Sequence, residues 1–385
     1  MTQDGRIRVL MIISGLSLGG AEGNLLKLVE RIDPERFLPI VVSLSGAGLL
    51  AHEIRNTGVL LHELRMERRF LASMRKLLQI SRQVRPDVIH GWMYHGNAAA
   101  SLAAMFLRPT PAVVHGIRAS PLAPGEAKRL TRFLLKFGGP LSHLASRVLY
   151  NAHSAANAHE AQYQYCRTRR QVISNGFDTD AFRPAPLSAL SVRDELGIAP
   201  TAQLVGLMGR YHPMKDHENF FLAAREVSKA LPNAHFLLAG EGLTNENKSL
   251  AELIARSMLG ARVHLLGPRR DMPRLLASLD VLASASAYGE AFPNVIGEAM
   301  SCGVVCVATS VGDSAAIIGD TGYVVPPRDP NELAARLKVA LALSSDERRL
   351  RGEAARTRIV KMYSLTGCVE DHMQLYQSLA QKRQY

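Results

Sequence analysis

Residues Val9–Ile13 read Val-Leu-Met-Ile-Ile, an uninterrupted apolar run that ends at Ser14-Gly15. Strands buried on both faces of a parallel sheet show such runs, and a following glycine allows the chain to turn. Arg6 and Arg8 precede the run, so a secretory signal peptide is the alternative. However, Ser14-Gly15 and Ser17 break the apolar stretch, and no small-residue cleavage site follows. The stretch therefore predicts a first β-strand that leads into a glycine-rich loop.

The same pattern continues along the whole chain, where short β-rich runs are separated by helical stretches of roughly a dozen residues. Parallel βαβ units have this pattern, so we predict an α/β protein with two doubly wound, Rossmann-like domains. The runs expected as strands are Ile7–Ile13, Leu38–Leu44, Val59–Leu64, Asp87–Gly91, Ala112–His115, Arg147–Tyr150 and Gln171–Ile173 in the first half, and Leu204–Gly209, His235–Gly240, Arg262–Gly267, Asp280–Ala285, Val304–Ala308 and Tyr323–Val325 in the second.

A proline-rich break at residues 182–186 divides the chain. Its sequence is Phe-Arg-Pro-Ala-Pro, and two prolines so close together indicate a linker. We predict an N-terminal domain over 1–183, a C-terminal domain over 184–362 and a closing segment, 363–385, that is helical from about Leu365 to Gln381. Two doubly wound domains joined in this way would face a central cleft at the carboxyl ends of their strands, where ligands bind in such folds.

Composition excludes several classes of protein. With 47% apolar and 21% charged residues, the chain has the balance of a globular protein. No stretch approaches the roughly 18–20 apolar residues that span a bilayer. Because its cysteines form no Cys-x-x-Cys pair, neither a zinc site nor a disulfide framework is predicted, and a cytoplasmic location fits. The four cysteines are Cys166, Cys302, Cys306 and Cys368.

The positive charge is concentrated in the first half of the chain. Residues 1–183 contain 24 Lys and Arg against 13 Asp and Glu, which gives +11, whereas residues 184–385 contain 22 against 21, which gives +1. The excess charge could form an ordinary solvated basic surface. Alternatively, the first half could face phosphates, either on an acceptor or on an anionic membrane. No nucleic-acid-binding module is recognisable, so we predict no nucleic-acid partner. The candidate membrane contacts are Arg68, Arg69, Arg75, Lys76, Lys128, Arg129 and Arg132.

Two glutamates, Glu290 and Glu298, flank the expected start of a helix. Pro293 suits the first position of that helix, and Gly303 supplies a stop signal. The N-terminus of a helix presents unpaired N–H groups and positive dipole charge, which suit a phosphate. Two carboxylates beside it could accept hydrogen bonds from the hydroxyls of a ribose and of a sugar. This arrangement predicts a nucleotide-sugar site.

A second charged segment, Gly209–Asp216, follows the first expected strand of the second half. Arg210 offers a planar fork of donors and Lys215 a mobile point charge, and together they could neutralise a diphosphate. The alternative is that both are surface charges on a loop. Their occurrence in one chain with Glu290 and Glu298 favours the diphosphate site.

Three loops of the first half carry further candidates. The segment containing Gly19 and Gly20 lacks the Gly-x-Gly-x-x-Gly spacing of a dinucleotide site, although its glycines allow close approach to a ligand. Trp92 and Tyr94 could stack on sugar rings or could pack the domain. A lone histidine such as His115 is more often a core residue than a catalyst.

Together these segments resemble the retaining glycosyltransferases of family 4, of the bacterial polysaccharide and glycolipid type, which have the GT-B fold. The resemblance covers nearly the whole chain, and Gly312–Ala315 departs from the glycine pair of many members. It implies that Arg210 and Lys215 hold the departing diphosphate, that Glu298 binds the ribose and Glu290 the sugar, and that the closing helix crosses back to the first domain. The resemblance also implies Gly19 and Gly20 near the donor, and His115 for catalysis with Arg118 near the transferred sugar. The remaining candidates are Asn294 for the donor and Trp92, Tyr94 and His95 for the acceptor.

The sequence thus predicts a metal-independent, retaining glycosyltransferase that needs no cofactor. Its donor would be a nucleotide-sugar, with UDP-linked hexoses and N-acetylhexosamines as the leading candidates, and its acceptor a saccharide or lipid-linked saccharide. The segment Asp178-Thr179-Asp180 is expected to form a turn and not a metal site. A GT-B-like sugar-nucleotide epimerase and a non-catalytic nucleotide-sugar-binding protein are the alternatives.

Overall fold

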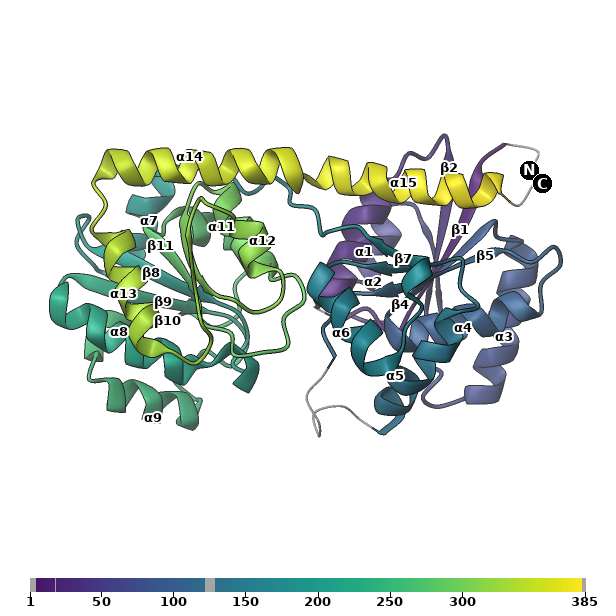
Figure 1. Cartoon of the computed structure of the whole chain (residues 1–385), viewed down its shortest axis with the longest axis horizontal. Helices are drawn as coiled ribbons and strands as arrows, with labels where there is room; N and C mark the ends of the chain where they lie inside the picture. Colours follow the sequence, from purple (N-terminus) through teal and green to yellow (C-terminus); the bar gives the residue numbers. More distant parts are fainter. Residues whose placement is uncertain (1–4, 18, 122–128, 383–385) are drawn as a thin grey trace. The chain divides into compact units, whose positions relative to one another are not determined.

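The computed structural model describes residues 5–17, 19–121 and 129–382. The chain divides into two compact units (Figure 1). Unit 1 comprises Met1–Gly176 with Leu365–Tyr385, and unit 2 comprises Phe177–Ser364. None of the described helices is long and apolar enough to span a membrane.

Unit 1 contains a seven-stranded parallel sheet with the strand order β3-β2-β1-β4-β5-β6-β7. The first strand, β1, lies between β2 and β4, with Ile7 opposite Phe37 and Val9 opposite Val88. Its run Val9–Ile13 is buried, as the sequence predicts. The strands are β1 (Ile7–Ile13), β2 (Phe37–Ser43), β3 (Leu60–Glu63), β4 (Val88–Trp92), β5 (Ala112–Ile117), β6 (Arg147–Tyr150) and β7 (Arg170–Val172).

Helices cover both faces of this sheet, because successive residues of a strand point to opposite sides. Val9, Met11 and Ile13 share a core with α1, α2 and α15, whereas Leu10 and Ile12 share a core with α3 and α4. The helices of unit 1 are α1 (Gly20–Arg31), α2 (Ala51–Asn56), α3 (Phe70–Val84), α4 (Met93–Met105), α5 (Arg129–Ser142), α6 (His153–Tyr163) and α15 (Leu365–Gln381), with a 3-10 turn, η1, at Arg167–Arg169.

Unit 2 repeats the design with a six-stranded parallel sheet of order β10-β9-β8-β11-β12-β13. Its strands are β8 (Gln203–Met208), β9 (Ala234–Ala239), β10 (Val263–Leu265), β11 (Val281–Ser284), β12 (Val305–Thr309) and β13 (Tyr323–Val325). Its helices are α7 (Pro186–Leu196), α8 (His217–Ala230), α9 (Lys248–Ser257), α10 (Met272–Ala277), α11 (Asn294–Ser301), α12 (Ser314–Ile318), α13 (Pro330–Leu341) and α14 (Ser345–Met362), with 3-10 turns η2 (Pro213–Lys215) and η3 (Gly260–Arg262).

Every run expected as a strand forms one, and Ile7–Ile13, Arg147–Tyr150 and Tyr323–Val325 match at both ends. The expected helix Leu365–Gln381 is observed as α15 with the same bounds. One helix start differs from the expectation: α11 begins at Asn294, and Pro293 is its N-cap residue with an extended backbone. Gly303 follows the end of α11 with a φ of +75°, the left-handed conformation that glycine adopts readily.

The division between the units falls after Gly176, earlier than the break that the prolines indicate. Phe177 donates its N–H to the carbonyl of Tyr363 at 2.9 Å, and Arg356 donates to the carbonyls of Thr179 at 2.9 Å and Phe182 at 3.0 Å, so this stretch is held to unit 2. Pro186 is the first residue of α7. Pro186 therefore marks the start of a helix and not a linker, because proline also favours the first position of a helix.

The closing helix α15 packs within unit 1. Val369, Met373 and Tyr376 lie in the same core as β1. The Tyr376 hydroxyl is 2.8 Å from Nδ1 of His90 on β4, so a polar contact adds to this packing. The last helix thus supplies part of the core of the unit that the first residues begin.

Candidate functional site

The predicted diphosphate residues lie where the strand order of unit 2 reverses. β8 and β11 are neighbours in the sheet although they are far apart in the sequence, and ligands of doubly wound sheets bind beyond the carboxyl ends of such a strand pair. The loop after β8 carries Arg210 and Lys215, and the loop after β11 carries Glu290. The N–H of Ala287 donates to the carbonyl of Met214 at 2.8 Å, which joins the two loops.

Glycine at the end of β8 allows Lys215 to fold back over the strand. Gly209 has a φ of +148°, and a Cβ there would lie 3.2 Å from Cε of Lys215. The loop continues through η2 to Asp216, whose carboxylate accepts the N–H of Asn219 at 3.2 Å and caps α8. The helix expected near Asp216 is therefore present, and its cap fixes the C-terminal end of the loop.

Lys215 and Glu290 form an ion pair across the two loops. Nζ of Lys215 lies 2.5 Å from Oε1 of Glu290, and Oγ of Ser286 donates to the same carboxylate oxygen at 3.1 Å. The two charged side chains are 18% and 13% exposed, so solvent screens the pair only in part. Arg210 is exposed, and its Nη2 lies 3.8 Å from Sδ of Met214 in the same loop. The structure therefore brings together a cation and a carboxylate that are 75 residues apart in the sequence.

Helix α11 follows the Glu290 loop and is seated closely on Phe177. A Cβ at Gly297 would lie 2.1 Å from the Phe177 ring, so only glycine permits this approach. Asn294 is the first residue of the helix, and Glu298 is in its second turn and partly exposed. Burial raises the pKa of the nearby Cys302 thiol to about 12, and the charge of Glu298 adds to this effect. Cys302 is therefore a protonated core residue and unsuited to act as a nucleophile.

The backbone of Gly312 packs closely against the backbone of the Glu290 loop. It has a φ of +63°, and a Cβ there would lie 2.7 Å from the carbonyl oxygen of Glu290 and 2.6 Å from that of Ala291. The N–H of Asp313 donates to the Ala291 carbonyl at 2.8 Å. The segment that departs from the family pattern thus holds the backbone that carries the carboxylate.

Replacing Gly312 with alanine is expected to destabilise unit 2 and to displace Glu290. The matched control is Gly260→Ala, because Gly260 has a φ of +56° but nothing within 4 Å of an added Cβ. Overpacking costs about 1–3 kcal/mol, so Gly312→Ala should lower the free energy of unfolding in urea by that much more than Gly260→Ala does. Equal losses in the two variants would show that the Glu290 loop tolerates the methyl group.

In unit 1 the glycine loop lies at the corresponding strand-order reversal, between β1 and β4. Gly19 is the N-cap residue of α1, Gly20 is its first residue, and both are exposed. Oγ of Ser17 donates to Oε1 of Glu22 at 3.2 Å in the first turn of the helix. Leu18 lies outside the described residues. The loop is accessible, as binding of a ligand by its backbone requires.

The aromatic acceptor candidates are core residues. Trp92 is fully buried, and Tyr94 is 5% exposed with its hydroxyl 2.9 Å from Nε2 of His159. Both rings fit the packing interpretation, since neither presents a face to which a sugar has access in this structure. His95 is half-buried, and burial lowers its pKa.

His115 and Arg118 make contacts inside unit 1. His115 is 1% exposed, its Nε2 lies 2.7 Å from Oγ of Ser101, and burial lowers its pKa to about 4. Contact with a sugar would require this buried hydrogen bond to break. Arg118 donates to Oδ1 of Asn175 at 2.9 Å and to Nε2 of His372 at 3.1 Å, and its guanidinium lies 4.1 Å from the centre of the Trp92 ring.

His372 explains why Arg118 faces α15. Burial, followed by the charge of Arg118, lowers the pKa of His372 to about 3, so its ring is neutral. Nδ1 lies 2.8 Å from the carbonyl of Cys368, which assigns the ring proton to Nδ1 and leaves Nε2 to accept from Arg118. The sequence did not single out His372, because its partner is 254 residues away. These contacts give Arg118 a structural role in the docking of α15.

Comparison with known proteins assigns both halves of the chain to one group of enzymes. Residues 18–181 match the model of Glycosyltransferase Family 4, and residues 202–342 match that of Glycosyl transferases group 1. The chain belongs to the family 4, group 1 glycosyltransferases. The two sheets of the chain, each flanked by helices on both faces, are the Rossmann-like domains of the GT-B fold.

Relatives and solved structures agree with this assignment. The D-inositol 3-phosphate glycosyltransferase of Mycobacterium marinum is 30% identical over 201 residues, which span 50% of this chain and 41% of the relative. The chain thus matches less than half the length of that protein. Anabaena HepE in complex with UDP has a TM-score of 0.84 at 22% identity, covering 97% of this chain and 100% of HepE. Sucrose-phosphate synthase from Thermosynechococcus elongatus has a TM-score of 0.78 at 18% identity, covering 97% and 99%.

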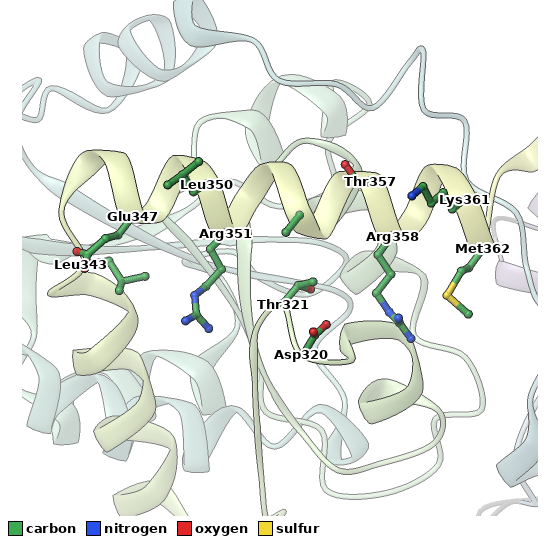
Figure 2. Close-up of a pocket in the computed structure, with 11 residues that line it drawn as sticks. Asp320, Thr321, Leu343, Glu347, Leu350, Arg351, Thr357, Arg358, Lys361 and Met362 are labelled. Atoms are coloured by element: carbon green, nitrogen blue, oxygen red, sulfur yellow. The ribbon is translucent and has the colours of Figure 1, made fainter.

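A separate pocket of about 700 Å³ lies elsewhere on unit 2. Figure 2 shows Arg351 and Arg358 extending from α14 toward Asp320 and Thr321. Those two residues precede β13, so this pocket is at the amino end of the sheet, opposite the ends that carry Lys215 and Glu290. It forms no part of the candidate site.

The described residues contain no group of three or more His, Cys, Asp or Glu side chains that could hold a metal ion. The Asp178 carboxylate accepts the N–H groups of Asp180 at 3.2 Å and Ala181 at 3.0 Å. Asp178-Thr179-Asp180 therefore forms a turn of the kind that the sequence predicts.

Proposed function

We propose that the chain transfers a sugar from a nucleotide-sugar donor to a saccharide or lipid-linked saccharide acceptor, with retention of the anomeric configuration and within the cytoplasm. The observation that carries the proposal is the Lys215–Glu290 pair at the carboxyl ends of β8 and β11. This pair places an ammonium group and a carboxylate side by side. The ammonium group suits the diphosphate of a donor, and the carboxylate suits the hydroxyls of its sugar.

Arg210 and Lys215 would stabilise the negative charge that develops on the departing diphosphate. Donors fixed in advance around developing charge usually contribute most to catalysis. The first turn of α11 adds the positive end of the helix dipole. Binding of the diphosphate would then replace Glu290 as the partner of Lys215 and make this carboxylate available to the sugar.

Glu290 and Glu298 would divide the recognition of the donor. In the family pattern Glu298 accepts from the ribose hydroxyls and Glu290 from the sugar. Their positions support this division, since Glu290 is beside the cation in the loop and Glu298 is in the second turn of α11. Asn294, the first residue of the helix, would complete the donor set.

The retaining course rests on the family and on the chemistry near the site. The Cys302 and Cys306 thiols are buried, and burial raises both pKa values, so neither is a ready nucleophile. We favour attack by the acceptor on the same face that the diphosphate leaves, with the leaving phosphate accepting the proton.

Incubation with a panel of labelled nucleotide-sugars tests the proposal. UDP-sugars come first, because structures of HepE contain UDP and UDP-glucose, and phosphorylated inositol is one acceptor to include, given the names of the curated relatives. Transfer, or slow release of free sugar, supports the proposal. An altered sugar still attached to its nucleotide would instead identify an epimerase, and binding without turnover a sugar-nucleotide-binding protein.

Activity is expected to persist after exhaustive treatment with EDTA. The physical reason is that Arg210 and Lys215 supply the positive charge that a divalent metal ion supplies in other transferases. Initial rates before and after chelation measure the effect. Loss of activity on chelation, with recovery on addition of Mn²⁺ or Mg²⁺, would contradict this prediction.

A further inference from the structure

Helix α5 of unit 1 has an apolar stripe on its outer surface. Leu135, Gly139 and Ser142 are buried and form the inner face. Three large apolar side chains at helical spacing are exposed, with Leu130 at 59%, Phe133 at 52% and Phe137 at 57%. At about 100° per residue, this stripe lies opposite the buried one. The Phe133 and Phe137 rings are in contact, tilted by 31° with their centres 4.2 Å apart, so the exposed surface is continuous.

Basic residues border the exposed stripe. Arg129, Arg132 and Lys136 are exposed and each precedes one member of the stripe, while α5 contains no acidic residue. None of the three forms an ion pair with any residue that the structure describes. Lys128, named with them from the sequence, lies outside the described residues. An interfacial helix has this combination of apolar side chains and flanking Lys or Arg.

A second patch of the same kind lies at the start of α3. Phe70 is 58% and Leu71 is 73% exposed, and the neighbouring basic residues are also exposed. The members of this basic group are Arg68, Arg69, Arg75 and Lys76. The helix itself contains no acidic residue.

Both patches begin at the same edge of the sheet. Helix α3 leads from β3 to β4 and α5 leads from β5 to β6, so each starts where a parallel strand ends. Both helices also contact α4 on one face of the sheet, as Figure 1 shows for unit 1. Much of the charge excess of residues 1–183 is thus gathered with exposed aromatic side chains on one side of unit 1.

We propose that the outer face of α5, together with the start of α3, docks unit 1 on an anionic lipid bilayer, with Phe133 and Phe137 entering the headgroup region. The basic residues would attract the acidic headgroups, and the apolar stripe would retain the protein once it is bound. A soluble polyanion would use the charges but gain nothing from an apolar stripe directed into water. The surface shares no residue with the Lys215–Glu290 site, so the inference does not depend on the proposed glycosyl transfer.

Flotation of the full chain with phospholipid vesicles tests the proposal. We expect binding to vesicles of phosphatidylglycerol and phosphatidylcholine, much weaker binding to phosphatidylcholine alone, and a decline as salt is added. The double variants Arg129→Glu/Arg132→Glu and Phe133→Ser/Phe137→Ser should each bind anionic vesicles about tenfold or more weakly. Matched controls in unit 2 are Lys248→Glu/Arg256→Glu, with the same change in net charge, and Leu187→Ser/Leu222→Ser, which also removes two exposed apolar side chains.

A second measurement separates insertion from surface adsorption. The variant Phe133→Trp places a reporter in the stripe, while the native tryptophan, Trp92, is buried. Brominated lipid should quench the introduced tryptophan and leave Trp92 emission unchanged. Absence of quenching, equal binding to neutral and anionic vesicles, or wild-type binding by both α5 variants would overturn the proposal. Thermal unfolding and UDP binding, measured on each variant, report the fold and the donor site independently.

Discussion

Replacing Lys215 with alanine is expected to lower kcat by about 10²–10³-fold, the effect of losing one preorganised electrostatic contact in a transition state. The loss has two parts. The diphosphate loses a cation, and the Glu290 carboxylate, 13% exposed, is left beside the phosphate without its partner at 2.5 Å. Arg210→Ala should have a comparable effect on kcat with less effect on folding, because Arg210 is exposed.

Steady-state kinetics and thermal unfolding of the same preparations measure these effects. Lys229→Ala is the matched control, since Lys229 also pairs with a glutamate, Glu226 at 2.6 Å, but on the surface of α8. We expect its kcat to be close to that of the wild type. Near-normal transfer by both Lys215→Ala and Arg210→Ala would remove the diphosphate assignment, whatever the stability of the two variants.

Replacing either of the two glutamates is expected to have a different effect on UDP binding. Glu298→Gln should weaken UDP binding about 10–100-fold, the usual contribution of a hydrogen bond to a charged group, because the ribose belongs to both donor and product. Glu290→Gln should leave UDP binding unchanged or tighter, since it frees the Lys215 charge, yet it should reduce sugar transfer by about 100-fold. Calorimetry with UDP, combined with transfer assays, tests both.

The reverse pattern would exchange the two roles. If Glu290→Gln abolished UDP binding while Glu298→Gln bound UDP normally, Glu290 would be the ribose ligand. The double variant Lys215→Ala/Glu290→Gln adds a further check, because groups in direct contact give non-additive effects. Its loss in kcat should be smaller than the product of the two single losses.

The strands, and the loops that carry the residues proposed for the donor, could be predicted because their signals are local. Uninterrupted apolar runs such as Val9–Ile13 identify buried parallel strands, and the order of strands in a doubly wound sheet then places loop residues at known edges. Lys215 and Glu290 are brought together in accordance with that rule. The contact of Gly312 with the Glu290 carbonyl was not foreseen, because it depends on the path of the backbone.

The surroundings of Trp92 and Arg118 could not be predicted in the same way, because α15 forms part of them. His90 and Tyr376 are 286 residues apart, and Arg118 and His372 are 254 apart. No local pattern shows that a helix so distant in the sequence would meet these strands. Trp92 therefore looked suited both to binding a sugar and to packing.

The outer face of α5 illustrates a different limit. Apolar residues at helical spacing are ordinarily assigned to the core. Leu130, Phe133 and Phe137 follow that spacing but are exposed, while Leu135 and Gly139 occupy the inner face. Three large apolar side chains of α5 thus lie on its outer face, so hydrophobic spacing alone does not identify the buried face.

The position of α15 also determines when each unit can be completed during protein synthesis. Residues 1–176 are made first, but the core they share with Val369, Met373 and Tyr376 stays open until α15 has left the ribosome. Unit 2 is one uninterrupted segment, Phe177–Ser364, and all of its core has been made by then. Domains usually fold in the order of their synthesis. In this chain the unit that is begun first is finished last, and any nascent chain that stops before Leu365 carries an uncovered apolar face on its first sheet.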